Sequence, residues 1–178
     1  ALGSDTGGSV RHPASICSLA GIKPTYGRVS RAGVVPLSFS LDNVGPLTRT
    51  VADNAIMLTT ISGHDPRDPA SARAEAVDFT ADLDKGVKGM RIGLVRHFYT
   101  EDLDAQPEMS ASVDGAAEIL RDLGATVEEV SMAPLSEYAA VNRVILLSEA
   151  YAIHEKWLQE RPGDYAHFTR ERLLPGAF

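Results

Sequence analysis

Residues 90–95 read MRIGLV, and after a polar stretch the chain continues as PEMSASVDGAAEILRDLG at residues 107–124 and ATVEEV at residues 125–130. The first segment is an almost continuous apolar run, which is typical of a strand buried in a parallel sheet. Pro107 is well placed to begin a helix with one apolar face, and Gly124 is well placed to end it. Strand, helix and strand in this order predict a βαβ unit, and therefore an α/β fold with a mixed β-sheet flanked by helices.

Helices are predicted on both sides of this unit. Thr50 is a favourable N-cap with Asp53 three residues later, so residues 50–62 should form a helix that Gly63 ends. Residues 135–160 should form a long amphipathic helix. The residues that recur at near-helical spacing, and are expected to share one side of it, are Tyr138, Val141, Ile145, Glu149, Ile153 and Trp157.

The remaining sequence is less regular. Residues 1–8 are expected to form a glycine-rich turn, residues 9–19 a short helix, and residues 21–46 a segment rich in loops, because Gly and Pro punctuate it. Residues 64–86 hold several Asp and Pro residues and should form a surface connection. The residues after Pro162 are expected to form a further helix or loop.

Composition excludes several classes of function. The 178-residue chain is 44% apolar with a net charge of −7, which describes an ordinary globular protein. An acidic chain without a basic stripe is not expected to bind nucleic acid directly, and no apolar run approaches the roughly 20 residues of a membrane span. The single cysteine, Cys17, excludes an internal disulfide and favours a cytoplasmic protein. The five histidines show no metal-ligand spacing, so no metal site is expected.

The stretch GSDTGGSVR, residues 3–11, is the candidate for chemistry. A serine that attacks an amide leaves an oxyanion, which is stabilised by several backbone N–H groups converging on one point. Gly7 and Gly8 permit the backbone conformations that such a loop needs, and Ser9 follows them directly. A serine hydroxyl also needs a base to take its proton. In isolation a Gly-Gly-Ser sequence is more often a structural or phosphate-binding turn.

The wider context is more specific, because GSDTGGSVR is followed by GIKPTYGRVSRAG and then by SLDNVGPLTRTVAD. Together these stretches resemble the amidase-signature family, whose amidohydrolases use a Ser–cis-Ser–Lys triad. The resemblance is dense over residues 1–62, while the βαβ unit and long helix of residues 90–178 are compatible with it. It implies that residues 1–178 are part of a single amidase-signature domain.

The resemblance also implies a role for each residue of the turn. Ser9 matches the nucleophile that becomes acylated, and the backbone of Thr6, Gly7, Gly8 and Ser9 matches the oxyanion hole. Asp5 and Arg11 match positions that brace the turn, by pairing with each other. The bridging serine and the lysine base lie upstream in the family, so the chain is expected to be an internal fragment that begins just before the nucleophile and is inactive alone. Lys23 follows the nucleophile and cannot replace that lysine.

Three functions are compatible with the sequence. The first is hydrolysis of a carbon–nitrogen bond in a small amide or ureide through a serine acyl-enzyme, in a protein that could form homo-oligomers. The second is the glutamine-hydrolysing subunit of a tRNA-dependent amidotransferase. Against it, residues 148–158 read SEAYAIHEKWL, where that subunit usually shows a Glu-Ala-Ser-Ser-Asn-Leu-like stretch. The third is a non-catalytic fragment that retains the fold.

A few other residues have competing interpretations. Cys17, with His12 as its base, is less convincing as a nucleophile than as a buried structural cysteine. Asp42 is interpreted as a residue that stabilises a turn rather than as an acid catalyst. Ser4 either supports the Gly-Gly-Ser turn or caps it. Glu149 is expected on a solvated face of the long helix more than in a substrate pocket.

Overall fold

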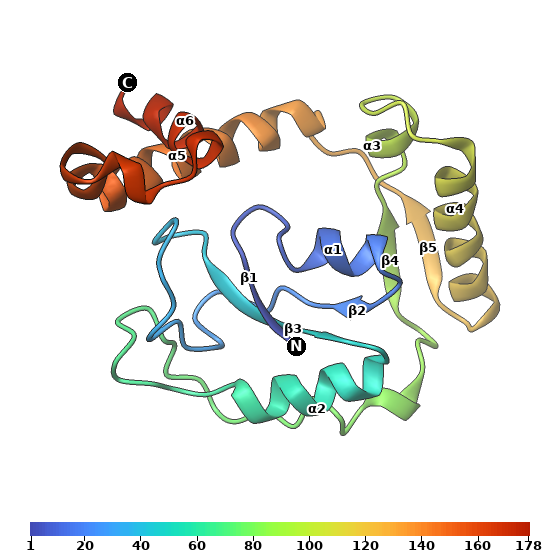
Figure 1. The fold of residues 1–178 in the computed structure, drawn as a ribbon. Helices are drawn as coiled ribbons and strands as arrows, with labels where there is room; N and C mark the ends of the chain where they lie inside the picture. The colour runs from blue at the N-terminus through green and yellow to red at the C-terminus, as the bar shows by residue number, and fades with distance from the viewer. The chain divides into compact units, whose positions relative to one another are not determined.

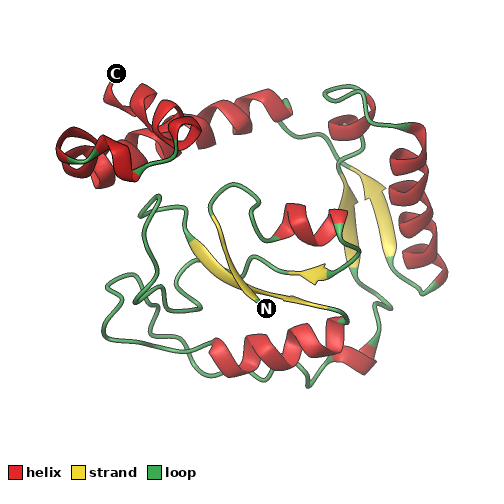
Figure 2. Ribbon diagram, viewed as in Figure 1, coloured by secondary structure: helices red, strands yellow, loops and turns green.

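The computed structural model describes all of residues 1–178, and the chain forms two compact units. Unit 1 comprises Ala1–Ala81 and Asn142–Phe178, and unit 2 comprises Asp82–Val141. No helix is both long enough and apolar enough to cross a lipid bilayer. One sheet of the chain is antiparallel and the other is parallel, and helices flank both. The fold therefore combines mixed β-structure with flanking helices, as the sequence predicts (Figure 2).

Unit 1 is built on a three-stranded sheet that the sequence does not predict. Its strands are β1 (Leu2–Asp5), β2 (Ala20–Gly21) and β3 (Asn43–Thr48). Both outer strands pair antiparallel with the central strand β3 (Figure 1). The register sets Asp5 opposite Asn43 and Gly21 opposite Leu47. The sequence predicts a turn over residues 1–8 and mainly loops over residues 21–46. These predictions are wrong for residues 2–5, which form β1, and for residues 43–46, which belong to β3.

Helix α1 (Arg11–Ile16) packs closely on this sheet because glycines face it. A Cβ on Gly21 of β2 would lie 2.5 Å from the Cβ of Ala14, and a Cβ on Gly3 of β1 would lie 3.1 Å from a methyl group of the fully buried Val10. The helix is shorter than the predicted residues 9–19, because residues 6–10 follow a turn before it begins.

Helix α2 (Val51–Ile61) confirms the predicted helix and its cap, since the Thr50 hydroxyl accepts a hydrogen bond from the N–H of Asp53 at 3.1 Å. Asn54, on the buried side of α2, fastens the helix to the sheet. Its side-chain amide donates to the backbone oxygen of Ala20 in β2 at 2.9 Å and to that of Pro46 in β3 at 3.3 Å.

Helix α5 (Leu135–Glu160) begins in unit 2 and continues into unit 1, where 3-10 turns and α6 (His167–Leu173) follow it. Its buried residues Ala150, His154 and Leu158 are spaced four apart, and Ala150 and Leu158 pack with Leu173 of α6. The predicted face of α5 is wrong, because its residues Tyr138, Val141 and Trp157 are exposed. The buried residues lie one position further along the helix. His154 is held between the hydroxyl of Tyr165 at 2.8 Å and the backbone oxygen of Pro36 at 3.1 Å.

Unit 2 contains the predicted βαβ unit. Strands β4 (Arg91–Leu94) and β5 (Thr126–Glu129) pair in parallel with Arg91 opposite Thr126, and α4 (Pro107–Asp122) connects them. The expectation that β4 is buried on both faces is wrong, since Arg91 and Gly93 are exposed and alternate with half-buried residues. A short helix α3 (His97–Thr100), which the sequence does not predict, is tied to α4 where the Tyr99 hydroxyl donates to Asp114 at 2.7 Å.

Candidate active site

The Gly-Gly-Ser turn lies between β1 and α1 and is organised around one buried carboxylate. Asp5 is fully buried, and its Oδ1 accepts hydrogen bonds from the backbone N–H of Gly8 at 2.7 Å and from Nη2 of Arg11 at 3.0 Å. Its Oδ2 accepts from Nε of Arg11 at 3.0 Å and, more weakly, from the N–H of Val10 at 3.3 Å. Asp5 and Arg11 are therefore paired, as expected, and the carboxylate closes the turn around itself.

The electrostatics of this pair favour the charged carboxylate. Burial by itself raises the pKa of Asp5, but the hydrogen bonds from Arg11 and from the N–H of Gly8 outweigh it and lower the pKa to about 2. The side chain of Arg11 is half exposed to solvent, whereas the carboxylate of Asp5 is fully buried. The brace is therefore intact throughout the neutral pH range.

The backbone N–H groups of the turn divide into two sets. Those of Gly8 and Val10 donate to Asp5, whereas those of Thr6, Gly7 and Ser9 make no hydrogen bond within the chain. Gly7 and Ser9 are exposed, and Gly8 has a φ of +121°, a conformation that side chains of L-residues rarely adopt. The turn thus presents free N–H donors at the surface while its other donors hold its shape.

Ser9 itself has no structural task in the chain. Its side chain is exposed, and its hydroxyl makes no hydrogen bond. Helix α1 starts with Val10 at the N-cap position and has no side-chain cap, so Ser9 is not a capping serine. Serine is a favoured N-cap residue, but the Ser9 hydroxyl does not cap α1.

Thr6 connects the start of the turn to a second buried carboxylate. Its hydroxyl donates to Oδ1 of Asp42 at 2.5 Å, while Oδ2 of Asp42 accepts from the N–H groups of Leu37 at 2.8 Å and Ser38 at 3.0 Å. Asp42 is therefore a turn-stabilising residue, as predicted. Its contact with Thr6 is not predicted from the sequence, because the two residues are 36 positions apart in the chain.

Glu149 of α5 meets the same loop. Its carboxylate accepts hydrogen bonds from the Ser38 hydroxyl, from the Ser40 hydroxyl at 2.7 Å and from the Ser40 N–H at 3.0 Å. Burial raises the pKa of Glu149, but these bonds outweigh it and hold the pKa below its ordinary value. The expectation of a solvated Glu149 is wrong, because the side chain anchors the loop of residues 37–42 to α5.

Helix α5 also approaches the turn directly. A Cβ placed on Gly7 would lie 3.5 Å from Oδ1 of Asn142 and 4.0 Å from a methyl carbon of Leu146. No hydrogen bond within the chain engages the Asn142 amide. The exposed side of the turn is therefore bordered by one polar and one apolar side chain.

Other candidates from the sequence lie away from the turn or have structural tasks. Cys17 is exposed at the end of α1, so the expectation of a buried cysteine is wrong. The Lys23 ammonium donates to the backbone oxygen of Pro24 at 3.0 Å, and the Ser4 hydroxyl makes no hydrogen bond to the turn. None of these groups, nor His12, is hydrogen-bonded to Ser9.

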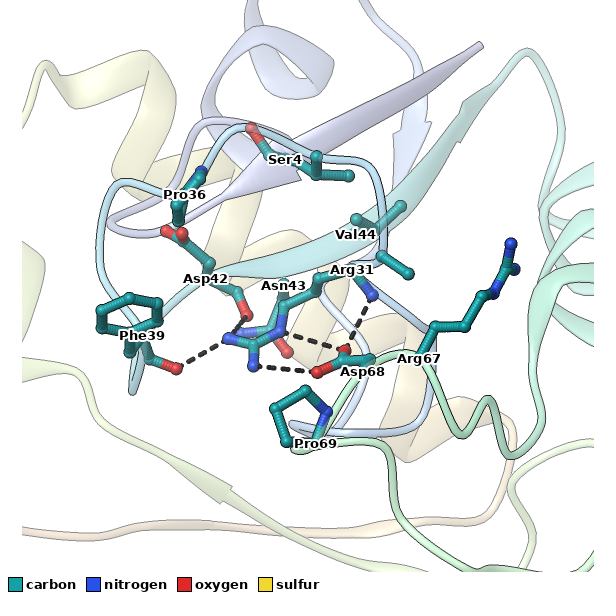
Figure 3. A pocket seen from close by; sticks show the side chains of 12 residues that line it. Ser4, Arg31, Pro36, Phe39, Asp42, Asn43, Val44, Arg67, Asp68 and Pro69 are labelled. Carbon is teal, nitrogen blue, oxygen red and sulfur yellow. Dashed lines mark hydrogen bonds and ion pairs between the residues drawn. The ribbon is translucent and has the colours of Figure 1, made fainter. Parts of the chain in front are cut away.

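A separate cavity of about 180 Å³ opens on unit 1, and Ser4, Arg31, Phe39 and Asp42 are among its lining residues (Figure 3). At its centre Arg31 pairs with Asp68 at 3.3 Å and donates to the backbone oxygen of Phe39 at 2.7 Å. Its guanidinium also lies 4.8 Å from the ring centre of Tyr26. The donors of Arg31 are thus used within the protein, and the cavity presents mainly a structural ion pair.

A serine turn between a strand and a helix, closed by a buried aspartate–arginine pair at the edge of an antiparallel sheet, defines this protein as an α/β protein of amidase-signature type. The chain matches the model of the Amidase family over residues 1–173, and it belongs to that family. This confirms the resemblance of the signature block.

Several curated relatives carry the name of the same subunit of glutamyl-tRNA(Gln) amidotransferase. The one from Macrococcus caseolyticus is 51% identical over 147 residues, which are 83% of this chain and 30% of that protein. The one from Rhodospirillum rubrum is 51% identical over an alignment of 197 positions, which covers 100% of this chain and 39% of that protein. The chain therefore spans about a third of the length of the curated relatives it matches.

Solved structures extend the comparison to amidases. A protein complex described as vestigial and as revealing the evolutionary origins of an s-triazine catabolic enzyme matches with a TM-score of 0.90 and 36% identity, over 99% of this chain and 37% of that one. The glutamyl-tRNA(Gln) amidotransferase subunit of Thermotoga maritima matches with a TM-score of 0.79 and 38% identity, over 99% and 37%. The native peptide amidase of Stenotrophomonas maltophilia matches with a TM-score of 0.72 and 36% identity, over 90% and 33%.

Proposed function

We propose that the full-length protein containing this chain hydrolyses a carbon–nitrogen amide bond through an acyl-enzyme formed on Ser9. The observation that carries the proposal is the exposed Ser9 hydroxyl, free of any structural hydrogen bond, in a turn where the N–H groups of Thr6, Gly7 and Ser9 are also free. Membership of the Amidase family supports this class of reaction.

In the proposed reaction the Ser9 oxygen attacks the amide carbon, and its proton passes to a base. The carbonyl oxygen becomes an anion that accepts hydrogen bonds from the free N–H groups of Thr6, Gly7 and Ser9. The C–N bond then breaks, the amine leaves with a proton, and water releases the acid from Ser9 by the reverse steps. Gly8, whose N–H is held by Asp5, contributes the backbone conformation of the turn rather than a donor.

The base is proposed to come from outside these residues. No lysine, histidine or second serine of the chain is hydrogen-bonded to Ser9, and in the family the lysine and bridging serine precede the nucleophile. We therefore expect residues 1–178 alone to show no turnover, because general-base catalysis contributes roughly 10²- to 10⁴-fold by itself. The proposal needs neither a metal nor an organic cofactor, and we place the protein in the cytoplasm on the strength of its single, unpaired Cys17.

Two substrates compete within this proposal. The curated relatives, which are about half identical to the chain and named as amidotransferase subunits, favour glutamine. The sequence SEAYAIHEKWL in α5 and the high structural similarity to the complex linked to s-triazine catabolism favour a small amide or ureide. The two share one mechanism at Ser9 and differ only in the group that the pocket accepts.

The test is to assay the full-length protein for ammonia release from glutamine, simple amides and ureides, alongside Ser9→Ala. Removal of the nucleophile should lower kcat by several orders of magnitude and abolish the acyl-enzyme seen by mass spectrometry. Cys17→Ala is the matched control and should leave turnover unchanged, because Cys17 is exposed at the far end of α1. Near-normal turnover by Ser9→Ala would remove the assignment, and the best substrate in the panel decides between glutamine and the smaller amides.

A further inference from the structure

Thr6 and Asp42 form the next opposed pair beyond the end of a strand ladder. The antiparallel pairing of β1 with β3 ends with Asp5 opposite Asn43, so Thr6 and Asp42 are the following residues on the two strands. Opposed residues of an antiparallel pair place their side chains on the same face and close together. The bond of 2.5 Å from the Thr6 hydroxyl to Asp42 therefore closes the sheet at the point where the Gly-Gly-Ser turn departs from it.

The geometry of Asp42 fixes the direction of this bond. Its carboxylate is buried and only accepts hydrogen bonds, and its other oxygen is already held by the N–H groups of Leu37 and Ser38. The Thr6 hydroxyl must therefore donate. Threonine is stiff at χ1, so fixing its hydroxyl also restricts the backbone of Thr6 and the direction of the N–H groups at the start of the turn.

The contact continues to helix α5. Ser38, whose N–H is bound to Asp42, donates through its hydroxyl to Glu149, and Ser40 adds two more bonds to the same carboxylate. The same helix places Asn142 and Leu146 beside Gly7. One continuous series of hydrogen bonds thus joins the turn to the helix that borders its exposed side.

We propose that Asp42 and Glu149 are positioning residues for the acyl-transfer reaction, which act by holding the Thr6 side chain and through it the oxyanion-binding turn. The inference rests on the proposed function of Ser9, because the turn has no oxyanion to bind without it. The bonds stabilise a donor geometry that is used in the transition state. Their loss should therefore lower kcat more than it raises KM.

The experiment uses Thr6→Val and Thr6→Ser in the full-length protein with its best amide substrate. Valine keeps the branched shape and loses the hydroxyl, and we expect kcat to fall roughly 10- to 100-fold with KM changed less than about threefold. Serine keeps the hydroxyl and should stay within about threefold of the parent kcat. Thr60→Val is the matched control, because the Thr60 hydroxyl bonds only to the Ile56 backbone oxygen of its own helix, and it should leave kcat unchanged.

A second measurement separates positioning from simple stabilisation. Affinity for a boronic acid that forms a tetrahedral adduct on Ser9 should fall in Thr6→Val by about the same factor as kcat/KM, whereas a merely structural role would leave both unchanged in the folded protein. Glu149→Gln keeps the side-chain shape and should lower kcat roughly 3- to 10-fold, and it reports on the same series of bonds if Thr6→Val fails to fold.

The outcomes distinguish the two proposals. An active Ser9→Ala would overturn the proposed function and this inference with it. An inactive Ser9→Ala beside folded Thr6→Val and Glu149→Gln variants that keep the parent kcat would overturn the positioning role alone. A Thr6→Ser variant as impaired as Thr6→Val would also contradict it, because the hydroxyl would then not be the group that matters.

Discussion

Asp5→Asn tests whether the buried carboxylate holds the Gly-Gly-Ser turn as the structure indicates. The substitution keeps the side-chain shape but removes the charge that Arg11 and the turn N–H groups bind. Lowering the pKa of Asp5 from 3.8 to about 2 corresponds to about 2 kcal/mol of stabilisation of the charged form in the folded protein. The asparagine NH₂ group would also face N–H donors, so we expect unfolding to become easier by about 2 to 3 kcal/mol.

The assay is equilibrium unfolding in urea at pH 7, followed by the fluorescence of Trp157, the only tryptophan of the chain. Asp164→Asn is the control, because Asp164 makes an exposed pair with Arg161 that contributes less than about 1 kcal/mol. An Asp5→Asn variant no less stable than Asp164→Asn would refute the reasoning.

The same carboxylate also predicts a pH dependence. The pKa of Asp5 is lower in the folded state than in the unfolded state. At pH values between these two pKa values the unfolded state binds more protons, so the folded state loses stability as the pH falls. The parent should therefore exceed Asp5→Asn in free energy of unfolding by the whole amount above a pH of about 4. This difference should become smaller as the pH falls towards 2. A difference that stays constant over that range would show that the charge of Asp5 is not what stabilises the turn.

Three glycine positions, Gly7, Gly8 and Gly115, test the backbone conformation of the turn and of α4. Gly8→Ala should cost roughly 1 to 2 kcal/mol of stability and lower kcat, because φ is +121° there. Gly7→Ala in the same turn is its control, since a Cβ there makes only ordinary contacts and φ is not positive; equal losses in the two variants would contradict the conformational argument. Gly115 lies inside α4, and a Cβ added there would have nothing within 4 Å. Gly115→Ala should therefore raise the free energy of unfolding of unit 2 by roughly 0.5 to 1 kcal/mol, measured by urea unfolding. A decrease would show that the structure requires glycine at this position.

The elements that the sequence predicts are those with local causes. Helix α2 follows from the Thr50 cap and its apolar residues, and the βαβ unit follows from two strand segments separated by a helix that starts at a proline. The Asp5–Arg11 pair is also local, because the two residues are six positions apart in one motif. Each of these features depends on residues that are close together in the chain, so a short stretch of sequence is enough to predict it.

The elements that the sequence misses depend on distant partners. Strand β3 contains Gly45 and Pro46, which disfavour a strand by propensity, yet the close approach of the Ile22 backbone requires glycine. A Cβ on Gly45 would lie 2.0 Å from the Ile22 oxygen. Helix α5 carries apolar residues on more than one side, so periodicity alone selects the stripe through Trp157 where tertiary packing buries the one through His154.

The residues that hold the candidate site also divide into one with a local partner and one with a distant partner. The reason is that successive side chains of a strand point to opposite faces of the sheet. Successive residues of β1 and its extension point in opposite directions, so Asp5 turns towards α1 and Thr6 turns towards the loop that holds Asp42. One anchor is an ion pair within the motif, and the other is a hydrogen bond that exists only because β1 and β3 pair in one register. Held from both sides in this way, the turn leaves Gly7 and Ser9 exposed with their N–H groups free. The motif therefore specifies which residues form the turn, while the strand register determines where its free donors point.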